Sequence, residues 1–264
     1  MKSLSIKFKN INVSFTDEGK GKAVVFLHGF LEDKTIWKHF SKEIASTSIR
    51  VITIDLLGHG LTNCLSYVHS MEEMAEAVEA VLKHLKIRKA YFVGHSLGGY
   101  VSLAFAEKNP DALRGLCMFH STARADSADK QKDRDRAIKV VKKNKKLFIN
   151  EAIPNLFNTQ HKPFKRAIEQ IKNIALATST QGVVAALEGM KIRLDREIIL
   201  KFAPYPVLYI IGKHDTILPH PQLMEQALLP KKGSYVLLEH VAHAGFAEDK
   251  QETLKAIKDF LKNG

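Results

Sequence analysis

Apolar and polar residues alternate near the start of the chain and then give way to continuous apolar runs. The alternation in segments 4–8 and 11–15 predicts two half-buried antiparallel strands. Segment 17–21 combines Asp, Glu, Lys and two glycines, and this composition predicts a turn. The uninterrupted apolar run 23–29 is typical of a strand buried on both faces. The chain is therefore expected to open with an antiparallel pair that leads into the interior of a sheet.

Buried strands and amphipathic helices then alternate along most of the chain. Such alternation predicts an α/β fold with a mostly parallel central sheet, and right-handed crossovers place helices on both of its faces. Ser70 and Glu73 have the spacing of a capping box at a helix start. The expected strands are 51–60, 91–99, 113–119, 206–212 and 234–239, and the expected helices are 34–45, 70–85, 221–229, 248–261 and one that follows 91–99 and closes at Asn109.

One long segment departs from this alternation. The pattern breaks at His120, and residues 123–190 are helical and charged in character, without a buried strand. An all-helical insertion between two buried strands is expected to lie over the sheet as a lid. Its larger apolar residues would either line a pocket or pack the insertion onto the core, and they are Leu147, Phe148, Ile149, Ile153, Leu156, Phe157 and Phe164.

Composition indicates an ordinary globular protein in a reducing compartment. Hydrophobic residues make up 45% and charged residues 26% of the 264 residues, which excludes a disordered or fibrous chain. The two cysteines, Cys64 and Cys117, form no CxxC pair and have no metal-ligand spacing, so a zinc site is not expected. The N-terminal segment shows no signal-peptide pattern and no apolar run is long enough for a membrane span, so a cytoplasmic location is expected.

The charge of the chain is concentrated in the helical insertion. The formal net charge is +12, and segment 122–203 holds 18 Lys and Arg against 9 Asp and Glu. The most basic stretch, 130–146, fits the solvated outer face of a helix. An alternative is that this stretch attracts an anionic partner, such as an anionic ester or an acyl group on an acidic carrier protein. Nucleic-acid binding is not expected, because no recognition motif accompanies the charge.

The candidate chemistry begins with Gly94-His95-Ser96-Leu97-Gly98, a G-x-S-x-G pattern at a predicted strand-to-helix junction. Such a junction holds the serine in a strained turn with its hydroxyl exposed above the sheet edge. Glycines on both sides avoid a collision between the strand and the helix. The N-terminus of the following helix offers unpaired N–H groups where an oxyanion would develop. Ser96 is therefore a candidate nucleophile.

A serine nucleophile needs a base and an acid that orients the base, and the chain supplies both in the expected order. Asp215 follows the predicted strand 206–212, and His240 and His243 follow the strand 234–239. Because the carboxyl ends of parallel strands meet at one edge of a sheet, these side chains can converge on Ser96. A helix-capping role is the alternative for Asp215. The backbone N–H of Phe30 and that of Leu97 are the candidate oxyanion donors.

At this point the chain resembles the α/β-hydrolase superfamily, and in particular its capped, serine-nucleophile esterase and lactonase-like branch. The resemblance implies an eight-stranded, mostly parallel sheet with a helical cap inserted after the sixth strand. It implies a core of residues 1–121 and 204–264 and a cap of residues 122–203. The matching motifs are HGF (28–30), DLLGHG (55–60), GHSLGGY (94–100), GKHD (212–215) and HAGFAED (243–249).

The resemblance also implies a role for each candidate residue. Ser96 is the nucleophile, His243 the base and Asp215 its orienting acid, while Phe30 and Leu97 donate to the oxyanion. One departure is Ala242, since the family usually has glycine before its catalytic histidine, and His240 stays as an alternative base.

The function expected from these residues is hydrolysis of a small or medium carboxylic ester through an acyl-enzyme, with no metal and no organic cofactor. An enol-lactonase and a C–C bond hydrolase with the same catalytic residues are the alternatives within the enzymes. A ligand-binding or interaction protein on a hydrolase fold is the alternative outside them. The sequence gives no indication of the oligomeric state.

Overall fold

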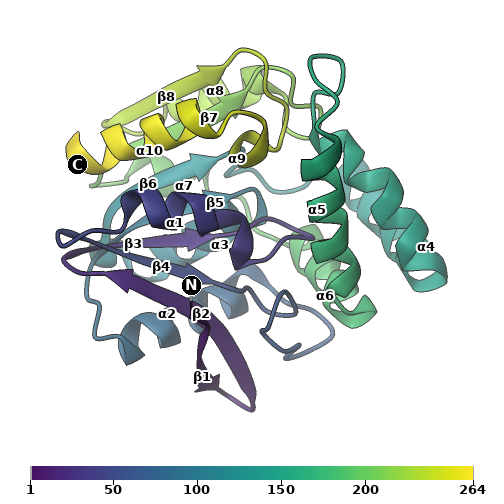
Figure 1. Ribbon diagram of the computed structural model, residues 1–264, viewed down its shortest axis with the longest axis horizontal. Coiled ribbons are helices and arrows are strands. Elements are labelled where there is room, and N and C mark those ends of the chain that lie inside the picture. Colours follow the sequence, from purple (N-terminus) through teal and green to yellow (C-terminus); the bar gives the residue numbers. More distant parts are fainter. Residues whose placement is uncertain (1, 264) are drawn as a thin grey trace.

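Eight strands form one mixed sheet in the order β1-β2-β4-β3-β5-β6-β7-β8 (Figure 1). The computed structural model describes residues 2–263. The pairs β1–β2 and β2–β4 are antiparallel, and all other neighbouring strands are parallel, as the sequence predicts. The strands are β1 (Leu4–Phe8), β2 (Ile11–Gly19), β3 (Lys22–Leu27), β4 (Ile49–Ile54), β5 (Ala90–His95), β6 (Leu113–Phe119), β7 (Val207–Gly212) and β8 (Gly233–Leu238).

The second strand is longer than the sequence pattern predicts. Segment 17–21 is expected to be a turn, but β2 continues to Gly19 because its end pairs with the start of β4. Asp17 lies opposite Ile52 in this ladder, and its two carboxylate oxygens accept hydrogen bonds of 2.8 and 2.7 Å from the Arg50 guanidinium. The bidentate ion pair and the strand partner hold acidic residues in a strand that local propensity would end.

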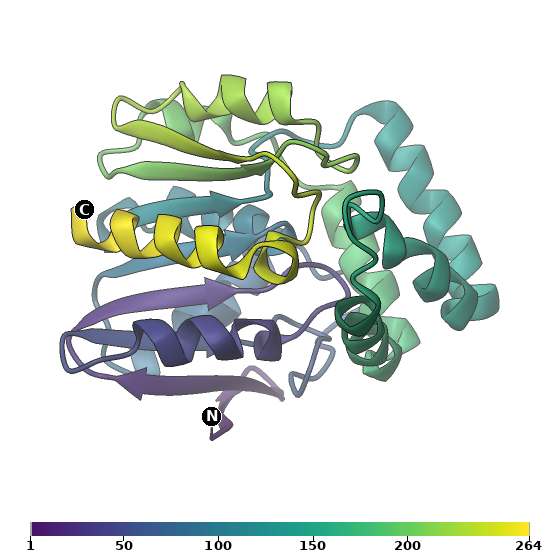
Figure 2. The ribbon, with the colours of Figure 1, turned by 45° about the horizontal axis from the view of Figure 1, so that its top comes forward.

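Helices cover both faces of the sheet, and α1 and α10 cross the near face in Figure 1 and Figure 2. Ser70 caps α2, since its hydroxyl accepts a hydrogen bond from the Glu73 N–H, as the capping-box spacing predicts. No described helix is both long enough and apolar enough to cross a lipid bilayer. The helices of the sheet region are α1 (Lys38–Ile44), α2 (Met71–His84), α3 (Leu97–Lys108), α8 (His220–Ala227), α9 (Gly245–Glu248) and α10 (Lys250–Asn263), with short 3-10 turns η1 (Lys34–Trp37) and η2 (Pro110–Ala112).

Only helices lie between β6 and β7 among the described residues, as the sequence predicts. Figure 2 shows the helices of residues 128–191 grouped in teal and green beside the arrowheads of the parallel strands, whereas the last helix, at residues 197–201, lies next to β6 in Figure 1. The first of these helices breaks at Asn144, whose backbone is non-helical and whose Oδ1 accepts a hydrogen bond of 3.0 Å from the Leu147 N–H. The division into a core and a cap stays a prediction. These helices are α4 (Ala128–Ala152), η3 (Pro154–Leu156), α5 (Lys165–Ala177), α6 (Thr180–Lys191) and α7 (Glu197–Lys201).

Two buried arginines attach this helical segment to the sheet region. The Arg196 guanidinium pairs with Glu107 of α3 at 2.9 Å and with Glu72 of α2. The Arg193 guanidinium lies 4.2 Å from the centre of the Tyr100 ring, which also belongs to α3. Charge pairs and a cation–π contact therefore reinforce the apolar contacts between the inserted helices and the sheet region.

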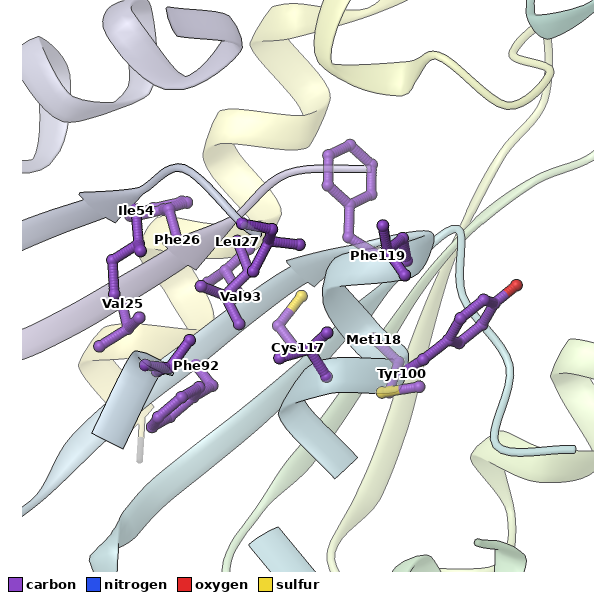
Figure 3. Close-up of a cluster of buried hydrophobic side chains, with 14 of the residues drawn as sticks. Val25, Phe26, Leu27, Ile54, Phe92, Val93, Tyr100, Cys117, Met118 and Phe119 are labelled. Carbon is purple, nitrogen blue, oxygen red and sulfur yellow. The ribbon is translucent and has the colours of Figure 1, made fainter. Parts of the chain in front are cut away.

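The core lies against the central strands, as Figure 3 shows for apolar side chains of β3, β4, β5, β6 and α3. Val25, Phe92 and Met118 are fully buried there. Cys117 is buried among them, and burial raises the pKa of its thiol, which agrees with its interpretation as a small core residue. Continuous burial explains why these strands are apolar at successive positions.

Candidate active site

Ser96 stands on a strained turn between β5 and α3. Its φ of 47° and ψ of −111° lie in a region that side chains other than glycine rarely adopt. The turn is held by its neighbours: the Ser96 N–H donates to Phe119 O at 3.0 Å, and the Ser121 hydroxyl donates to Ser96 O at 2.7 Å. The backbone of Ser96 is consequently held at the carboxyl end of β5, and the residue lines a cavity there.

The glycines around Ser96 are required by close backbone approaches. A Cβ on Gly98 would lie 2.3 Å from Leu27 O, and a Cβ on Gly94 would lie 2.5 Å from the Gly98 backbone. Helix α3 thus crosses β3 and β5 at a distance that only glycine permits. This geometry agrees with the steric reason for which the sequence pattern places glycines on both sides of the serine.

Asp215 and His243 meet although the chain separates them by a whole strand. Asp215 follows β7 and His243 follows β8, and the His243 Nδ1–H donates to Asp215 Oδ2 at 2.7 Å. The other carboxylate oxygen, Oδ1, accepts from the N–H groups of Ile217 and Leu218 at 2.8 and 2.9 Å. Asp215 therefore holds the turn after β7 and the imidazole at the same time, whereas the next helix, α8, begins at His220 and has Pro219, not Asp215, at its N-cap.

The electrostatics of this pair favour an ionised carboxylate beside a basic imidazole. Burial acts to raise the pKa of Asp215, but the charge and hydrogen bond of His243 hold it below its ordinary value. Burial acts to lower the pKa of His243, but Asp215 raises it above the ordinary value. The pair is thus arranged to accept a proton on the imidazole and keep the carboxylate charged.

The other histidine considered as a base lies elsewhere. His240 is exposed, and its ring stacks on that of His161 at a centroid distance of 4.6 Å. A different histidine, His120, lies near the carboxylate, with Nδ1 3.7 Å from Asp215 Oδ2. That nitrogen accepts a hydrogen bond from the Gly212 N–H, and burial holds the pKa of His120 well below its ordinary value. Of the three, only His243 is hydrogen-bonded to Asp215 among the described residues.

Two N–H groups near Ser96 are free to bind an oxygen. Leu97 is the first residue of α3, and Phe30 lies on the loop after β3. Within residues 2–263, no hydrogen bond occupies the N–H of either residue. Free N–H groups at a helix N-terminus and on a neighbouring loop are the donors from which an oxyanion hole is built.

A cavity of about 380 Å³ lies beside Ser96 and Phe30. Ser96 and His243 line it together with Phe30, while Asp215 lies behind His243. Its volume falls within the range of small-molecule pockets, roughly 300–1,000 Å³. Of the apolar residues expected either to line a pocket or to pack the insertion, three line this cavity, and they are Phe148, Ile153 and Leu156.

The sequence reasoning missed a buried pair of Glu32 and His95 in the wall of the same cavity. Glu32 Oε2 lies 2.9 Å from His95 Nδ1 and accepts from the Gly29 N–H at 2.6 Å, and His95 Nε2 donates to His243 O at 2.9 Å. Burial acts to raise the pKa of Glu32, but the His95 ring holds it below the ordinary value. The pair links the loop after β3 to the loop of His243. Glu32 stands in a segment that resembles a solvated helix start, so its sequence alone does not signal burial.

Comparisons with known proteins agree with this architecture. Residues 22–250 match the family described as the alpha/beta hydrolase fold. A thermophilic esterase from Thermogutta terrifontis is 30% identical, superposes with a TM-score of 0.92, and the alignment covers 100% of this chain and 99% of that one. The enol-lactonase from Burkholderia xenovorans LB400 is 20% identical, with a TM-score of 0.90 and coverage of 98% and 100%, and this likeness shows the fold alone.

A curated relative points to the same class of enzyme. The pimeloyl-[acyl-carrier protein] methyl ester esterase of Neisseria meningitidis serogroup B is 27% identical over 251 residues, which are 92% of this chain and 94% of the relative. The family match covers most of the chain, and these relatives are named as esterases and hydrolases. The protein is therefore a hydrolase and belongs to the α/β-hydrolase family.

Proposed function

We propose that the protein hydrolyses carboxylic esters through a covalent acyl-enzyme on Ser96. The observation that carries the proposal is the position of Ser96 on a strained turn in one cavity with His243, whose ring is held by Asp215. A serine hydroxyl is a weak nucleophile until a neighbouring base takes its proton. The raised pKa of His243 makes the imidazole a stronger base for that task.

The reaction proceeds in two acyl transfers. Ser96 Oγ attacks the ester carbonyl carbon while His243 Nε2 takes the hydroxyl proton, and a tetrahedral oxyanion forms. The C–O bond to the alcohol then breaks, and the imidazolium returns the proton to the leaving alkoxide. Water repeats the sequence on the acyl-enzyme and releases the carboxylic acid and free Ser96. Asp215 stays ionised throughout and stabilises the imidazolium.

The N–H groups of Phe30 and Leu97 bind the oxyanion in this proposal. Neither N–H group donates another hydrogen bond in the described part of the chain, so each can donate to the oxyanion without first losing an existing partner. Donors that are fixed before the reaction stabilise the transition state more than the planar carbonyl, and removal of one donor typically costs about 10²–10³ in kcat.

The substrate is proposed to be a small or medium ester whose acyl or alcohol group fits an apolar cavity. The cavity holds about 380 Å³, and residues of α4 and η3 form part of its wall. We accordingly assign residues 122–203 as the cap that closes over the bound ester. An apolar wall contributes binding energy through the area it removes from water, so rate is expected to depend on chain length.

A second candidate is an ester with an anionic group, either free or attached to an acidic carrier. Lys130 lines the cavity, and among residues 2–263 its ammonium has no carboxylate partner. The neighbouring Arg134 is already paired with Asp126 at 2.8 Å. A relative is named as an esterase of an acyl-carrier-protein ester, which is the same substrate chemistry. Under this candidate, Lys130→Ala raises KM for anionic esters and leaves neutral esters unchanged.

The proposal is tested by initial rates on p-nitrophenyl esters from acetate to decanoate, measured for the wild type and for Ser96→Ala. A fall of about 10³-fold or more in the rate of the variant supports the proposal. The ester chain length with the highest rate then indicates how large a group the cavity accommodates. Equal rates in the two proteins refute Ser96 as the nucleophile. Turnover of lactones or vinylogous diketones without ester hydrolysis would assign the same residues to an enol-lactonase or a C–C hydrolase.

A further inference from the structure

The loop that carries His243 has backbone N–H groups that neither a sheet nor a helix satisfies. Residues 241–244 follow β8 and precede α9, and they are buried. A buried N–H without a partner costs about as much as a lost hydrogen bond. The position of His243 therefore depends on which groups accept from this loop.

A single carboxylate accepts on both sides of His243. Glu248 Oε1 accepts from the Ala242 N–H at 3.0 Å and from the Ala244 N–H at 3.1 Å. Glu248 lies at the end of α9, directly after the loop. Since the two N–H groups flank His243 in sequence, this oxygen fixes the backbone on which the imidazole is mounted.

The second carboxylate oxygen reaches into the inserted helical segment. Glu248 Oε2 accepts from the Asn158 N–H at 2.8 Å, and Asn158 lies just beyond η3. The contact is doubled by Leu156 O, which accepts from the N–H groups of His243 and Ala244 at 2.9 and 3.0 Å. Leu156 also lines the cavity, so the same segment touches the space where the ester is proposed to bind.

We propose that Glu248 is a positioning residue that joins the His243 loop to the inserted helical segment, so that the wall of the cavity and the base move as one unit. The inference rests on the proposed role of His243. Glu248 touches no reacting atom, and it acts through the backbone at Ala242, Ala244 and Asn158. The carboxylate is suited to this position because all three partners are donors, and both oxygens of an ionised carboxyl group accept hydrogen bonds while neither carries a donor proton.

Charge is the second consequence of a carboxylate at this position. Burial raises the pKa of Glu248 above its ordinary value, and its negative charge in turn contributes to the raised pKa of His243. Removal of that charge therefore lowers the pKa of His243. The other ionisable groups around the ring, from every element that packs against it, are Asp215, Glu32, His95, His120 and, across the cavity, Lys130, Asp133, Arg134 and Glu151.

Two substitutions separate geometry from charge. Glu248→Gln keeps the length but turns one acceptor into an amide donor and removes the charge. Glu248→Asp keeps the charge but is one methylene shorter and does not reach all three N–H groups. Glu252→Gln is the matched control, because Glu252 is an exposed carboxylate four residues further on that lies in α10.

The test measures the His243 pKa by NMR titration of its ring signals, together with kcat and KM for an ester. For Glu248→Gln we expect the His243 pKa to fall by about half a unit or more. For both Glu248 variants we expect kcat to fall about tenfold with little change in KM, because misplacement of the base slows the reaction more than binding. The NMR titration of His243 needs no substrate, so it tests the role of Glu248 even if the protein does not hydrolyse esters.

A measurement on the unmutated protein keeps the inference testable if the variants do not fold. The amide proton signals of Ala242, Ala244 and Asn158 are expected to shift together, with one midpoint, as the Glu248 carboxyl titrates. Three independent midpoints would overturn the inference. So would a folded Glu248→Gln protein in which the His243 pKa and kcat both equal those of Glu252→Gln.

Discussion

His243 Nδ1 lies 2.7 Å from Asp215 Oδ2, and both side chains are almost completely buried. A hydrogen bond of this kind fixes the tautomer of the imidazole, because the proton on Nδ1 leaves Nε2 free to accept another. The carboxylate is itself held by two N–H groups that follow it in the chain. The basicity of His243, the proposed base, therefore depends on the turn after β7, which holds Asp215, as well as on the loop after β8.

Asp215→Asn is expected to lower kcat by about 10³–10⁴-fold, because an amide can present its donor to the imidazole and favour the wrong tautomer. Ester hydrolysis by the purified variant measures the loss. Thermal denaturation serves as the control, since the turn bonds from Ile217 and Leu218 have an acceptor in asparagine too. A fall of less than about tenfold, in a folded variant, would contradict the role of the carboxylate.

The rate is expected to rise with pH through a midpoint above the ordinary histidine pKa of 6.5, because His243 must be neutral to act as a base and its pKa is raised. In Asp215→Asn the midpoint of the rate profile moves to lower pH. Profiles of kcat/KM for both proteins measure the two midpoints.

The raised pKa of His243 in the unmutated protein also affects the stability of the fold. The protonated imidazole stabilises the folded state fully below pH 6.5, and this contribution is lost as the pH rises through the folded-state pKa of His243.

His243 and His240 are expected to differ sharply when each is replaced by alanine. His243→Ala removes the base and lowers kcat by about 10³-fold or more. His240→Ala removes an exposed ring that stacks on His161, and kcat stays within about twofold of the wild type. A larger loss in His240→Ala than in His243→Ala would reassign the base.

Gly98→Ala is expected to destabilise the protein by about 1–3 kcal/mol, because the new methyl group would lie 2.3 Å from Leu27 O, a backbone atom of a buried strand. Urea denaturation followed by circular dichroism measures the change in the free energy of unfolding. An unchanged urea midpoint would show that α3 can move away from β3 without loss of stability.

Phe148→Ala is expected to shift the preferred ester toward longer chains, because Phe148 forms part of the cavity wall, where its ring contacts that of Phe30. For the shortest esters, lost contact is expected to lower kcat/KM by about tenfold. Leu147→Ala is the matched control, since the adjacent leucine is 47% exposed and does not line the cavity. The same chain-length preference in both variants would place the acyl group elsewhere.

Much of this fold is predictable because buried strands and their helices have local signals. The apolar runs at 23–29 and 206–212 correspond to β3 and β7, and Ser70 caps α2 as its spacing indicates. The extension of β2 through Asp17 is not predictable in this way. It depends on the partner strand β4 and on Arg50, which lies far along the chain.

The candidate site also contains residues that have local sequence signals and residues whose role depends on distant parts of the chain. Ser96 is marked by glycines whose steric reason is local, and the order Ser, Asp, His follows from the order of the strands. Glu32 carries no such mark, because it stands in a segment that resembles a helix start, and only the folded chain brings it, through His95, to the His243 loop. Glu248 lies five residues after His243 and within the motif 243–249, but its contact with Asn158, 90 residues away in the chain, depends on the fold.

The central claim is that Ser96 forms a covalent acyl-enzyme, and labelling with a fluorophosphonate tests it most directly. The reagent phosphonylates an activated serine with loss of fluoride, and the intact mass and the modified peptide are measured together with residual activity. We expect one adduct per chain, on Ser96, that appears in step with the loss of ester hydrolysis and is absent in Ser96→Ala. Loss of activity with an adduct on another residue, or full activity in the labelled protein, would contradict the claim.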